Sequence, residues 1–362
     1  MFNDRIYNFS AGPSMLPLPV LEQAAAEMTN YRDSGMSVME MSHRSKAYLA
    51  IFEETKADLK RLFHVPDTHE VLFIQGGATL QFAAVPMNLI GKTGKADYAL
   101  TGNFSTLAMK EAKKYGEINI AASSEDRNHT YIPAQSSLKL TPDASYFHYC
   151  ANNTIYGTEW KYIPETGDVP LVCDMSSNIL SKPVDVSKFG VIYAGAQKNM
   201  APAGMAVVII DKALAGKELP FTPKLMSYQT LIDGDSMHNT PPCYTIYVLG
   251  LVLKWLETQG GVEGMEKIKT QKAKYLYDYL DESAFFSGCA DKEARSDMNV
   301  TFRSTSAELD EQFAKAAAKA GFDNLKGHRS VGGMRASIYN AMPMEGVTKL
   351  VDFMKDFEAK NK

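Results

Sequence analysis

Short apolar runs alternate with longer amphipathic stretches along most of the chain. The short runs are rich in β-branched and aromatic residues and are apolar at consecutive positions, which is typical of strands buried on both faces. They are VLFI (71–74), SYFHYC (145–150), PLVCDM (170–175), GVIYAGA (190–196) and MAVVII (205–210). A helical stretch follows the first run and extends through Leu89. The pattern predicts an α/β fold with a mainly parallel central sheet flanked by helices.

The pattern changes after about residue 260. Gly260-Gly261 ends one helix, and a long amphipathic helix is expected from there to about Tyr279. The elements expected beyond it are a strand at MNVTFR (298–303), a helix from a capping box at Thr305 and Glu308 through Ala320, a strand at RASIY (335–339) and a last helix near Pro343. This order predicts a second, smaller α/β domain.

Bulk composition narrows the classes of function. The chain has 362 residues, 45% of them hydrophobic and 22% charged, which excludes disordered and fibrous proteins and favours two domains. A net charge of −4 provides no basic surface for nucleic acid. The first ten residues lack the pattern of a signal peptide, and no apolar run is long enough to span a membrane. We expect a soluble, cytoplasmic protein.

The four cysteines carry no metal or redox motif. No C-x-x-C pair occurs, so neither a zinc site nor dithiol chemistry is indicated. Cys150 and Cys173 lie in apolar runs and are expected to be small buried hydrophobic residues. We therefore expect no metal in this protein.

A lysine directly after a buried strand is the first candidate for chemistry. The segment Gly195-Ala196-Gln197-Lys198-Asn199 leads the run GVIYAGA into Lys198. One interpretation is a strand-end lysine whose ammonium reaches solvent, the usual environment of lysine. The other is a lysine desolvated in a cleft, with a lowered pKa, that forms an imine with an aldehyde. The segment alone leaves both open.

An aspartate 24 residues earlier adds weight to the second interpretation. Asp174 closes the apolar run PLVCD, where a carboxylate is unfavourable without a partner. It is either a turn or helix-capping aspartate, as Ser176 and Ser177 favour, or the counter-ion of a protonated pyridine nitrogen. Functional groups of open α/β sheets collect at the carboxyl ends of strands, and Asp174 and Lys198 both occupy such positions.

A glycine turn and an aromatic residue are weaker signals. The segment Gln75-Gly76-Gly77-Ala78-Thr79 stands between a strand and a helix, where backbone N–H groups at a helix N-terminus bind phosphate. It matches neither the dinucleotide fingerprint nor the Walker loop, so it is either a site for a single phosphate or an ordinary turn. Phe104, after Gly102-Asn103, is either a core residue or a ring that lies flat on a cofactor.

A set of cationic residues near paired glycines is the last signal. His328-Arg329 and Arg335 flank Val331-Gly332-Gly333, and His43-Arg44 forms a second pair early in the chain. Arginines in an exposed glycine loop are suited to bidentate binding of anions, although solvated surface charge is the more common role. A substrate with two anionic groups would use such a cluster.

Six stretches of the chain carry a family resemblance. They are NFSAGPSMLP (8–17), SVMEMSHRS (37–45), FIQGGATLQFAAVPMNL (73–89), GVIYAGAQKN (190–199), HNTPP (238–242) and KGHRSVGGMRASIYNAMP (326–343). Together they resemble the phosphoserine aminotransferase family, a class V group of the fold-type I pyridoxal-phosphate enzymes. The resemblance covers essentially the whole chain. It implies a large cofactor-binding domain over 16–260 and a small C-terminal domain over 261–362, with the segment 1–15 packing near the small domain.

The resemblance also implies a role for each candidate residue. Lys198 would be the Schiff-base lysine of pyridoxal 5'-phosphate, and Asp174 would be the partner of its pyridine nitrogen. Ala78 and Thr79 would bind the cofactor phosphate, and Phe104 would stack on the ring. Thr154 would be the partner of the ring hydroxyl, and Gln197 would make a further contact with the cofactor. Asn239 and Thr240 would reach the cofactor phosphate of the neighbouring subunit, which requires a homodimer with shared active sites. Arg335 would hold the substrate α-carboxylate, and His43, Arg44, His328 and Arg329 the distal phosphate or carboxylate, some of them across the dimer interface.

Two positions depart from the family pattern. The ring-stacking position is often tryptophan in bacterial members and is Phe104 here, which offers less area and no N–H donor. The N-terminal motif often reads NFSSGP, and Ala11 replaces its second serine. A substrate hydrogen bond made by that serine would be absent. Neither change affects the expected class of reaction.

The implied reaction is reversible amino transfer. Glutamate and 3-phosphohydroxypyruvate would give 2-oxoglutarate and phosphoserine, in serine biosynthesis, and 4-phosphohydroxy-threonine of pyridoxine biosynthesis is a further possible substrate. Lys198 would be the general base, and the kinetics would be ping-pong. The expected partners are therefore small molecules and a second copy of the chain.

Three other functions remain open from the residues alone. A cysteine desulfurase of class V would need a mobile nucleophilic cysteine late in the chain, for which Cys289 is the candidate. A lyase or aldolase without pyridoxal phosphate would keep Lys198 and leave the phosphate loop unexplained. A non-catalytic binding protein would use Lys198 only structurally.

Overall fold

The structure is a computed structural model that describes residues 5–361. Residues 1–4 and 362, which belong to the predicted N-terminal segment and small domain, lie outside the described residues. No helix within 5–361 has the length and apolar character needed to cross a membrane. The same residues contain no group of three or more His, Cys, Asp or Glu side chains placed to hold a metal ion.

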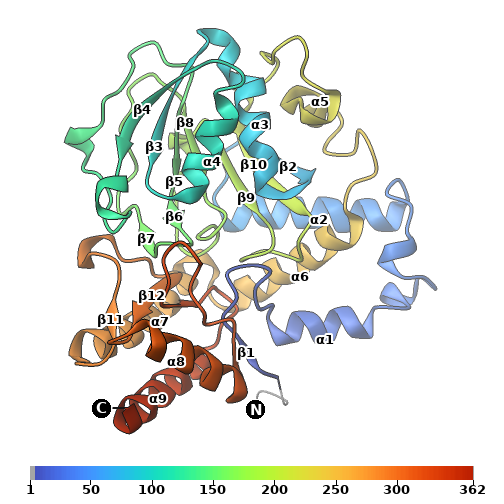
Figure 1. The fold of residues 1–362 in the computed structure, drawn as a ribbon. Helices are drawn as coiled ribbons and strands as arrows, with labels where there is room; N and C mark the ends of the chain where they lie inside the picture. Colours follow the sequence, from blue (N-terminus) through green and yellow to red (C-terminus); the bar gives the residue numbers. More distant parts are fainter. Residues whose placement is uncertain (1–4, 362) are drawn as a thin grey trace.

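A seven-stranded sheet forms the centre of the larger part of the molecule (Figure 1). Its order is β2 (His69–Gln75), β10 (Met205–Asp211), β9 (Val191–Gly195), β8 (Leu171–Asp174), β5 (Phe147–Cys150), β3 (Lys95–Leu100) and β4 (Glu117–Ser123). Neighbouring strands are parallel except at β10, which runs antiparallel to both β2 and β9. The predicted mainly parallel sheet is confirmed, and all five apolar runs are strands in it.

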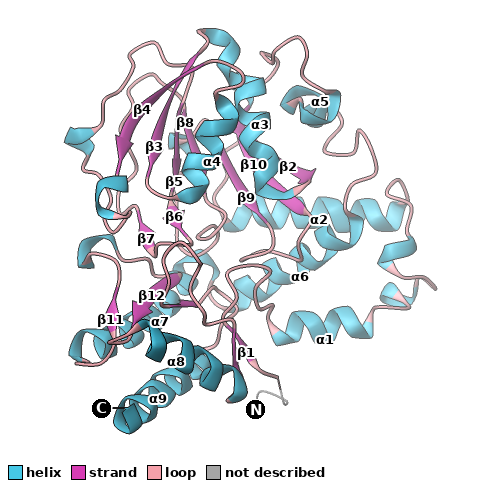
Figure 2. Ribbon diagram, in the orientation of Figure 1, coloured by secondary structure: helices cyan, strands magenta, loops and turns pink. Residues whose placement is uncertain are grey.

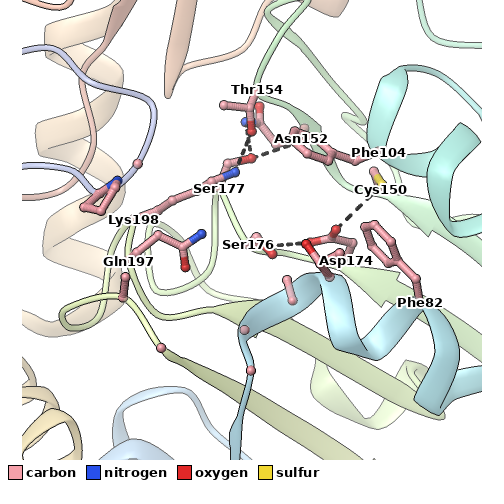
Figure 3. A pocket seen from close by; sticks show the side chains of 18 residues that line it. Phe82, Phe104, Cys150, Asn152, Thr154, Asp174, Ser176, Ser177, Gln197 and Lys198 are labelled. Carbon is pink, nitrogen blue, oxygen red and sulfur yellow. Dashed lines mark hydrogen bonds between the residues drawn. The ribbon is translucent and has the colours of Figure 1, made fainter.

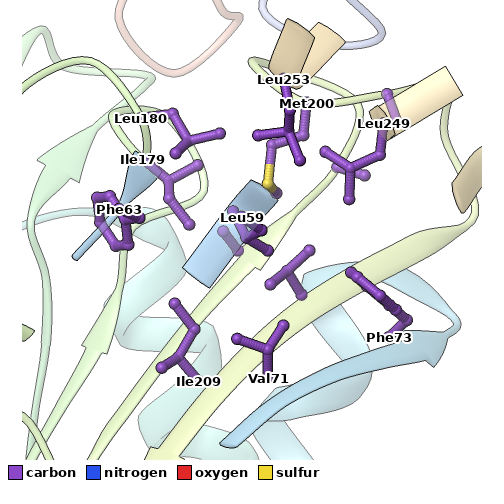
Figure 4. Close-up of a cluster of buried hydrophobic side chains, with 14 of the residues drawn as sticks. Leu59, Phe63, Val71, Phe73, Ile179, Leu180, Met200, Ile209, Leu249 and Leu253 are labelled. Carbon is purple, nitrogen blue, oxygen red and sulfur yellow. The ribbon is translucent and has the colours of Figure 1, made fainter. Parts of the chain in front are cut away.

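Each face of this sheet is covered by helices. Within β2, Val71 and Phe73 enter one core cluster, whereas Leu72 and Ile74 enter another, because successive side chains of a strand point to opposite faces. The first cluster is shared with α1 (Leu18–Ala26), α2 (Lys46–Leu62) and α6 (Cys243–Thr258), and part of it is shown in Figure 4. The second is shared with α3 (Gly77–Leu89), α4 (Asn103–Ala112) and α5 (Tyr228–Asp233).

A smaller sheet and three helices make up the C-terminal part (Figure 2). The sheet is antiparallel, in the order β11 (Ser287–Gly288), β12 (Asn299–Arg303) and β14 (Met334–Ser337). The helices are α7 (Gly261–Glu282), α8 (Ala307–Lys319) and α9 (Met344–Asn361). The strands expected at 298–303 and 335–339 are thus present, and α9 begins directly after Pro343, as expected. A further short hairpin, β6 (Asn152–Asn153) with β7 (Thr158–Glu159), follows β5.

We propose a domain boundary near residue 260, where Gln259 and Gly260 separate α6 from α7 and where Gly260 and Gly261 have φ angles of 87° and 68°. The N-terminal segment supports this division, because β1 (Tyr7–Asn8) pairs in parallel with β13 (Phe322–Asp323). Phe9 and Met15 also belong to the core cluster of the C-terminal part. Residues 7–15 therefore include segments that pack with the C-terminal part.

The predicted capping box of α8 is wrong by one residue. The helix begins at Ala307, and its N-cap is Ser306, whose hydroxyl accepts a hydrogen bond from the Leu309 N–H at 3.2 Å. The spacing of Thr305 and Glu308 matched the T-x-x-E motif, but Thr305 lies before the cap. Glu308 instead lies in the first turn, where a carboxylate interacts favourably with the helix dipole.

We expect Ser306→Ala to destabilise the protein by about 1 kcal/mol, because it removes an N-cap hydrogen bond. Thr305→Ala is the matched control and should change the free energy of unfolding by a few tenths of a kcal/mol at most. Urea unfolding of both variants, followed by far-ultraviolet circular dichroism, measures the difference. A larger loss for Thr305→Ala than for Ser306→Ala would contradict the assignment of the cap.

Candidate active site

A cavity of about 380 Å³ opens at the carboxyl ends of β8 and β9 (Figure 3). Strand β8 ends in Asp174, and β9 leads through the Ala196-Gln197 turn into Lys198, so both predicted groups lie at one edge of the sheet. The predicted site residues that line the cavity are Ala78, Thr79, Phe104, Thr154, Asp174, Gln197 and Lys198. The sequence-predicted cofactor site is thus brought together, apart from Asn239 and Thr240.

Lys198 is buried, with only 8% of its surface exposed. Its Nζ donates a hydrogen bond to Thr154 Oγ1 at 2.7 Å (Figure 3). Burial lowers the pKa of Lys198 to about 8, although the Asp174 carboxylate opposes this shift. The interpretation of Lys198 as a solvated strand-end lysine is therefore wrong. Near neutral pH a useful fraction of the amine is uncharged, which an amine nucleophile requires.

Asp174 makes the turn contact considered for it and also faces the cavity. Its Oδ1 accepts a hydrogen bond from the Ser176 N–H at 2.8 Å, as in an aspartate turn, and the Cys150 thiol lies 3.9 Å from Oδ2. The side chain also lines the cavity. Burial raises the pKa of Asp174, while Ser176 and the charge of Lys198 act in the opposite direction. A buried carboxylate of this kind is suited to bind a cationic group of a ligand.

The glycine turn builds an anion site at the same cavity. Gly76 and Gly77 have φ angles of 97° and 68°, a region open mainly to glycine, and α3 begins at Gly77. A Cβ atom on Gly76 would approach Leu80 Cδ2 to 2.8 Å. The first backbone N–H groups of a helix have no partner within it, and here they belong to residues such as Ala78 and Thr79. They are suited to bind a phosphate.

Phe104 forms an aromatic wall of the cavity. It lies in the first turn of α4, is partly buried, and its ring centroid is 5.4 Å from Lys198 Nζ. The ring therefore faces the reactive amine. An amine, a carboxylate, a helix N-terminus and an aromatic face together match the aldehyde, ring nitrogen, phosphate and planar ring of pyridoxal phosphate, so the residues fit this cofactor.

A cluster of cations lies beside the cavity. Arg335 on β14 is largely buried, and its Nε has no hydrogen-bond partner among residues 5–361. Burial lowers the pKa of Arg335, and its charge in turn lowers the pKa of Lys198. The pKa of His328 is lowered by burial and by the charges of Arg335 and Arg329. The charge of Arg335 therefore reaches both the Lys198 amine and His328, and the charge of Arg329 reaches His328.

The other predicted residues do not line the cavity. His43 and exposed Arg44 precede α2, and the blue connection between α1 and α2 lies at the right edge of Figure 1, away from the ends of β8 and β9. Asn239 and Thr240 follow α5, and the Thr240 carbonyl accepts a hydrogen bond from Gln75 Nε2 at 2.6 Å. In one chain none of these four residues lines the cavity that holds Lys198.

Sequence reasoning missed several residues that shape the site. The Ser14 N–H donates to the Gln197 carbonyl at 2.9 Å, and the Ser14 hydroxyl donates to the Lys198 carbonyl, so the N-terminal segment fixes the lysine turn. No local pattern could indicate this contact across 184 residues. Ser176, by contrast, stands two residues after Asp174, and the sequence already indicated the aspartate turn that the structure contains.

Comparison with known proteins decides the family. The family model for aminotransferase class V matches residues 6–350. The chain belongs to the class V aminotransferases.

A phosphoserine aminotransferase of Desulfosudis oleivorans is 54% identical over 359 residues, which cover 99% of each chain. The structure of a phosphoserine aminotransferase from Bacillus circulans subsp. alkalophilus superposes with a TM-score of 0.97 at 48% identity, covering 99% of this chain and 100% of that one. A pyridoxal-phosphate-bound phosphoserine aminotransferase from Trichomonas vaginalis gives a TM-score of 0.93 at 42% identity, covering 97% and 100%.

The desulfurase alternative within class V is not favoured. Cys289 lies in a separate cavity of about 460 Å³ whose lining does not include Lys198. Burial raises the pKa of the Cys289 thiol, although Arg303 opposes this shift. A nucleophilic cysteine needs a lowered pKa and access to the reacting centre. The pKa of Cys289 is raised, and its cavity is separate from the one that Lys198 lines.

In the ligand-free aminotransferase we expect Lys198 to titrate near pH 8 and Asp174→Asn to lower this pKa, because the carboxylate now favours the ammonium form. Competitive acetylation over a pH series, with Lys198 quantified by peptide mass spectrometry, measures it. The matched control is Asp168→Asn on an exposed turn, which should leave the titration of Lys198 unchanged. An unshifted or raised midpoint in Asp174→Asn would contradict the assigned contact.

Proposed function

We propose that this aminotransferase catalyses reversible amino transfer between glutamate and 3-phosphohydroxypyruvate, giving 2-oxoglutarate and O-phosphoserine. The observation that carries the proposal is the buried Nε of Arg335, which has no hydrogen-bond partner among residues 5–361, together with the charge that Arg335 exerts on the buried Lys198 amine. A buried polar atom without a partner is unfavourable unless a ligand completes it. Phosphoserine aminotransferases similar over the full length support the choice of substrates.

Pyridoxal phosphate would be held by residues that line the cavity. Lys198 and Asp174 would bind its aldehyde carbon and ring nitrogen, and Phe104 would contact its ring face. Ala78 and Thr79 would bind its phosphate, while Thr154 and Gln197 would contact the ring substituents. When bound, this cofactor supplies an electron sink for negative charge at the substrate α-carbon.

Lys198 is the proposed base for the α-proton. Its Nζ is positioned by Thr154 Oγ1, and a pKa of about 8 lets it both accept and return a proton near neutral pH. Arg335 lowers this pKa and so favours the free amine. Burial excludes water, which keeps the proton on Nζ between its removal and its return.

The cation cluster would bind both substrates in the same way. Glutamate and phosphoserine each carry an α-carboxylate and a second anionic group. Arg335 would bind the carboxylate in bidentate fashion, and His328 with Arg329 would bind the distal anion. His43 and Arg44 would complete the site for the distal anion. This site would accept a carboxylate or a phosphate, because both groups have several oxygens that accept hydrogen bonds.

We propose that His43, Arg44, Asn239 and Thr240 act in the active site of a second copy of the chain. All four lie outside the cavity of their own chain, and Arg44 and Thr240 are exposed. His43 Nε2 is buried without a hydrogen-bond partner among the described residues, so its own chain leaves it available. A two-fold homodimer would complete both sites. We also propose that the enzyme acts in the cytoplasm.

Borohydride trapping is the direct test of this function. Reduction of the protein loaded with pyridoxal phosphate should fix the cofactor on the peptide that contains Lys198, because that amine is buried in the cavity with a lowered pKa. Lys198→Ala should show no trapped cofactor and no measurable turnover of glutamate with 3-phosphohydroxypyruvate. Lys272→Ala is the control, since Lys272 is also buried and has its pKa lowered to about 7 but does not line the cavity. Trapping at another lysine would rule out the proposal.

Subunit mixing tests the shared site. Lys198→Ala and Arg44→Ala are each expected to be almost inactive alone. Random exchange of their subunits should restore about a quarter of the wild-type activity, because a heterodimer then holds one intact site.

Arg329→Ala is the matched control for mixing with Lys198→Ala. The charge of Arg329 acts on His328 of its own chain, together with that of Arg335, so Arg329 and Lys198 should serve the same site. This pair should restore no activity. Equal recovery in both mixtures would contradict the division of residues between subunits.

A further inference from the structure

The small sheet has one apolar face and one polar face, because successive side chains of a strand point to opposite sides. The apolar side chains belong to the core cluster of the C-terminal part and are Val300 and Phe302 of β12 and Met334 and Ala336 of β14. Asn299 and Thr301 alternate with them on β12 and pair in register with Ser337 and Arg335 of β14. These four polar residues therefore share the other face of the sheet, and Arg335 is one of them.

The polar face is bonded to the hairpin β6–β7, which belongs to the larger part of the molecule. Asn299 Oδ1 accepts a hydrogen bond from Asn152 Nδ2 at 2.8 Å, and Thr301 Oγ1 donates to the Tyr156 carbonyl at 3.1 Å. The approach is close, since a Cβ atom on Gly157 would lie 2.6 Å from Thr301 Oγ1 and 2.8 Å from the Asn299 carbonyl oxygen. The hairpin therefore fixes the position of β12.

Backbone donors determine how the two asparagine amides are oriented. The N–H groups of Met298 and Asn299 donate to Ser296 Oγ at 3.0 Å and 2.9 Å. They occupy both lone pairs of this hydroxyl, so its own proton goes to Asn152 Oδ1 at 2.5 Å. Asn152 Nδ2 then faces Asn299 Oδ1, which leaves Asn299 Nδ2 to donate to β14.

Asn299 connects the hairpin to the strand that carries Arg335. Its Nδ2 donates to Ser337 Oγ at 3.0 Å and to the Tyr339 hydroxyl at 3.1 Å, and both acceptors follow Arg335 on or just after β14. Asn152, Asn299 and Ser337 are each at most 5% exposed. These hydrogen bonds therefore lie in a region of low dielectric constant, where a hydrogen bond is stronger than in water.

The same hairpin also holds the reactive amine. Thr154 lies in the turn between Asn152 and Tyr156, and its Oγ1 accepts the hydrogen bond from Lys198 Nζ at 2.7 Å. One short segment is thus bonded both to the Lys198 amine and to the residues that hold the strand of Arg335. Proton transfer at a bound substrate requires the base and the substrate to be correctly placed, and a small misplacement lowers the rate strongly.

We propose that Asn152 and Asn299 are positioning residues that hold Arg335 at a fixed place relative to Lys198 through the hairpin β6–β7. This inference rests on the proposed function, in which Arg335 binds the substrate α-carboxylate. The buried Nε of Arg335 has no hydrogen-bond partner among residues 5–361, so the place of this atom depends on its strand. Asn299 is the residue to vary, because Asn152 lines the cavity and Asn299 does not.

Affinity for glutarate tests the proposal. This dicarboxylate resembles 2-oxoglutarate but has no keto group, so it binds the protein loaded with pyridoxal phosphate without reacting. Asn299→Ala should raise the Kd of glutarate about tenfold, which is within the range of coupling energies in one network. In an Arg335→Ala background the same change should raise the Kd about twofold at most, because the guanidinium that Asn299 positions is gone.

The comparison of the two backgrounds separates positioning from a general loss of structure. Equal fold-changes in both backgrounds, or no change in either, would overturn the proposal. Ser337→Ala removes one acceptor of Asn299 and takes the place of Asn299→Ala if that variant does not fold. Its effect on the Kd should depend on Arg335 in the same way.

Asn88→Ala is the matched control. Asn88 is 1% exposed, and its side chain makes three hydrogen bonds of 2.7–2.8 Å, but it does not line the cavity. This variant should reduce the free energy of unfolding, as Asn299→Ala does, and leave the Kd of glutarate unchanged. An equal rise of the Kd in Asn88→Ala would mean that loss of stability explains the effect, and the proposal would fail.

The surroundings of Arg335 can also be measured without any ligand. Proton–nitrogen correlation spectra of protein labelled at arginine should contain a signal from the buried Arg335 Nε–H, identified by its absence in Arg335→Lys. Asn299→Ala should shift or broaden this signal, and Asn88→Ala should not. An unchanged signal in Asn299→Ala would overturn the proposal. If the loaded wild-type protein bound no glutarate, the proposed substrates would be wrong, whereas this measurement would still decide the role of Asn299.

Discussion

Burial of one amine is the constraint on which the site depends. In water a lysine has a pKa near 10.4 and is almost fully charged at neutral pH. Here the amine of Lys198 lies in a cavity at the edge of a sheet, where desolvation favours its neutral form and the Asp174 carboxylate favours its charged form. The balance between the two brings its pKa into the range where a proton moves in either direction. The effect of Asp174 depends on the pairing of β8 with β9, which brings the two strand ends together.

The charges around this amine are incompletely paired among the residues that the structure describes. In that part of the chain Arg335 Nε has no hydrogen-bond partner, and Asp174 has a weak thiol contact at one carboxylate oxygen. Such groups reduce stability, and the close-packed cores on both faces of the large sheet compensate for this loss. The arrangement is that of a site preorganised for a ligand with both positive and negative groups.

The sequence predicted the elements that local pattern controls. Consecutive apolar residues located the central strands, and Asp174 and Lys198 could be assigned because each follows such a run. The antiparallel direction of β10 could not be predicted, since a strand buried on both faces is equally apolar in either direction. The contact of Ser14 with the lysine turn joins segments 184 residues apart, which no local pattern reveals. The error at Thr305 arose because the T-x-x-E motif fits residues 305–308, whereas the residue that caps the helix, Ser306, has Leu309 at the fourth position and so does not match the motif.

Strand β10 also has a consequence for how the enzyme is made. It runs back between β9 and β2, and the Gly204 carbonyl accepts a hydrogen bond from the Gly76 N–H at 3.1 Å. The glycine turn and the lysine turn, far apart in sequence, therefore become neighbours only when this strand inserts. During synthesis on the ribosome, β2 has no partner in the large sheet until residues 205–211 have emerged, so its exposed edge must be protected from aggregation for that time.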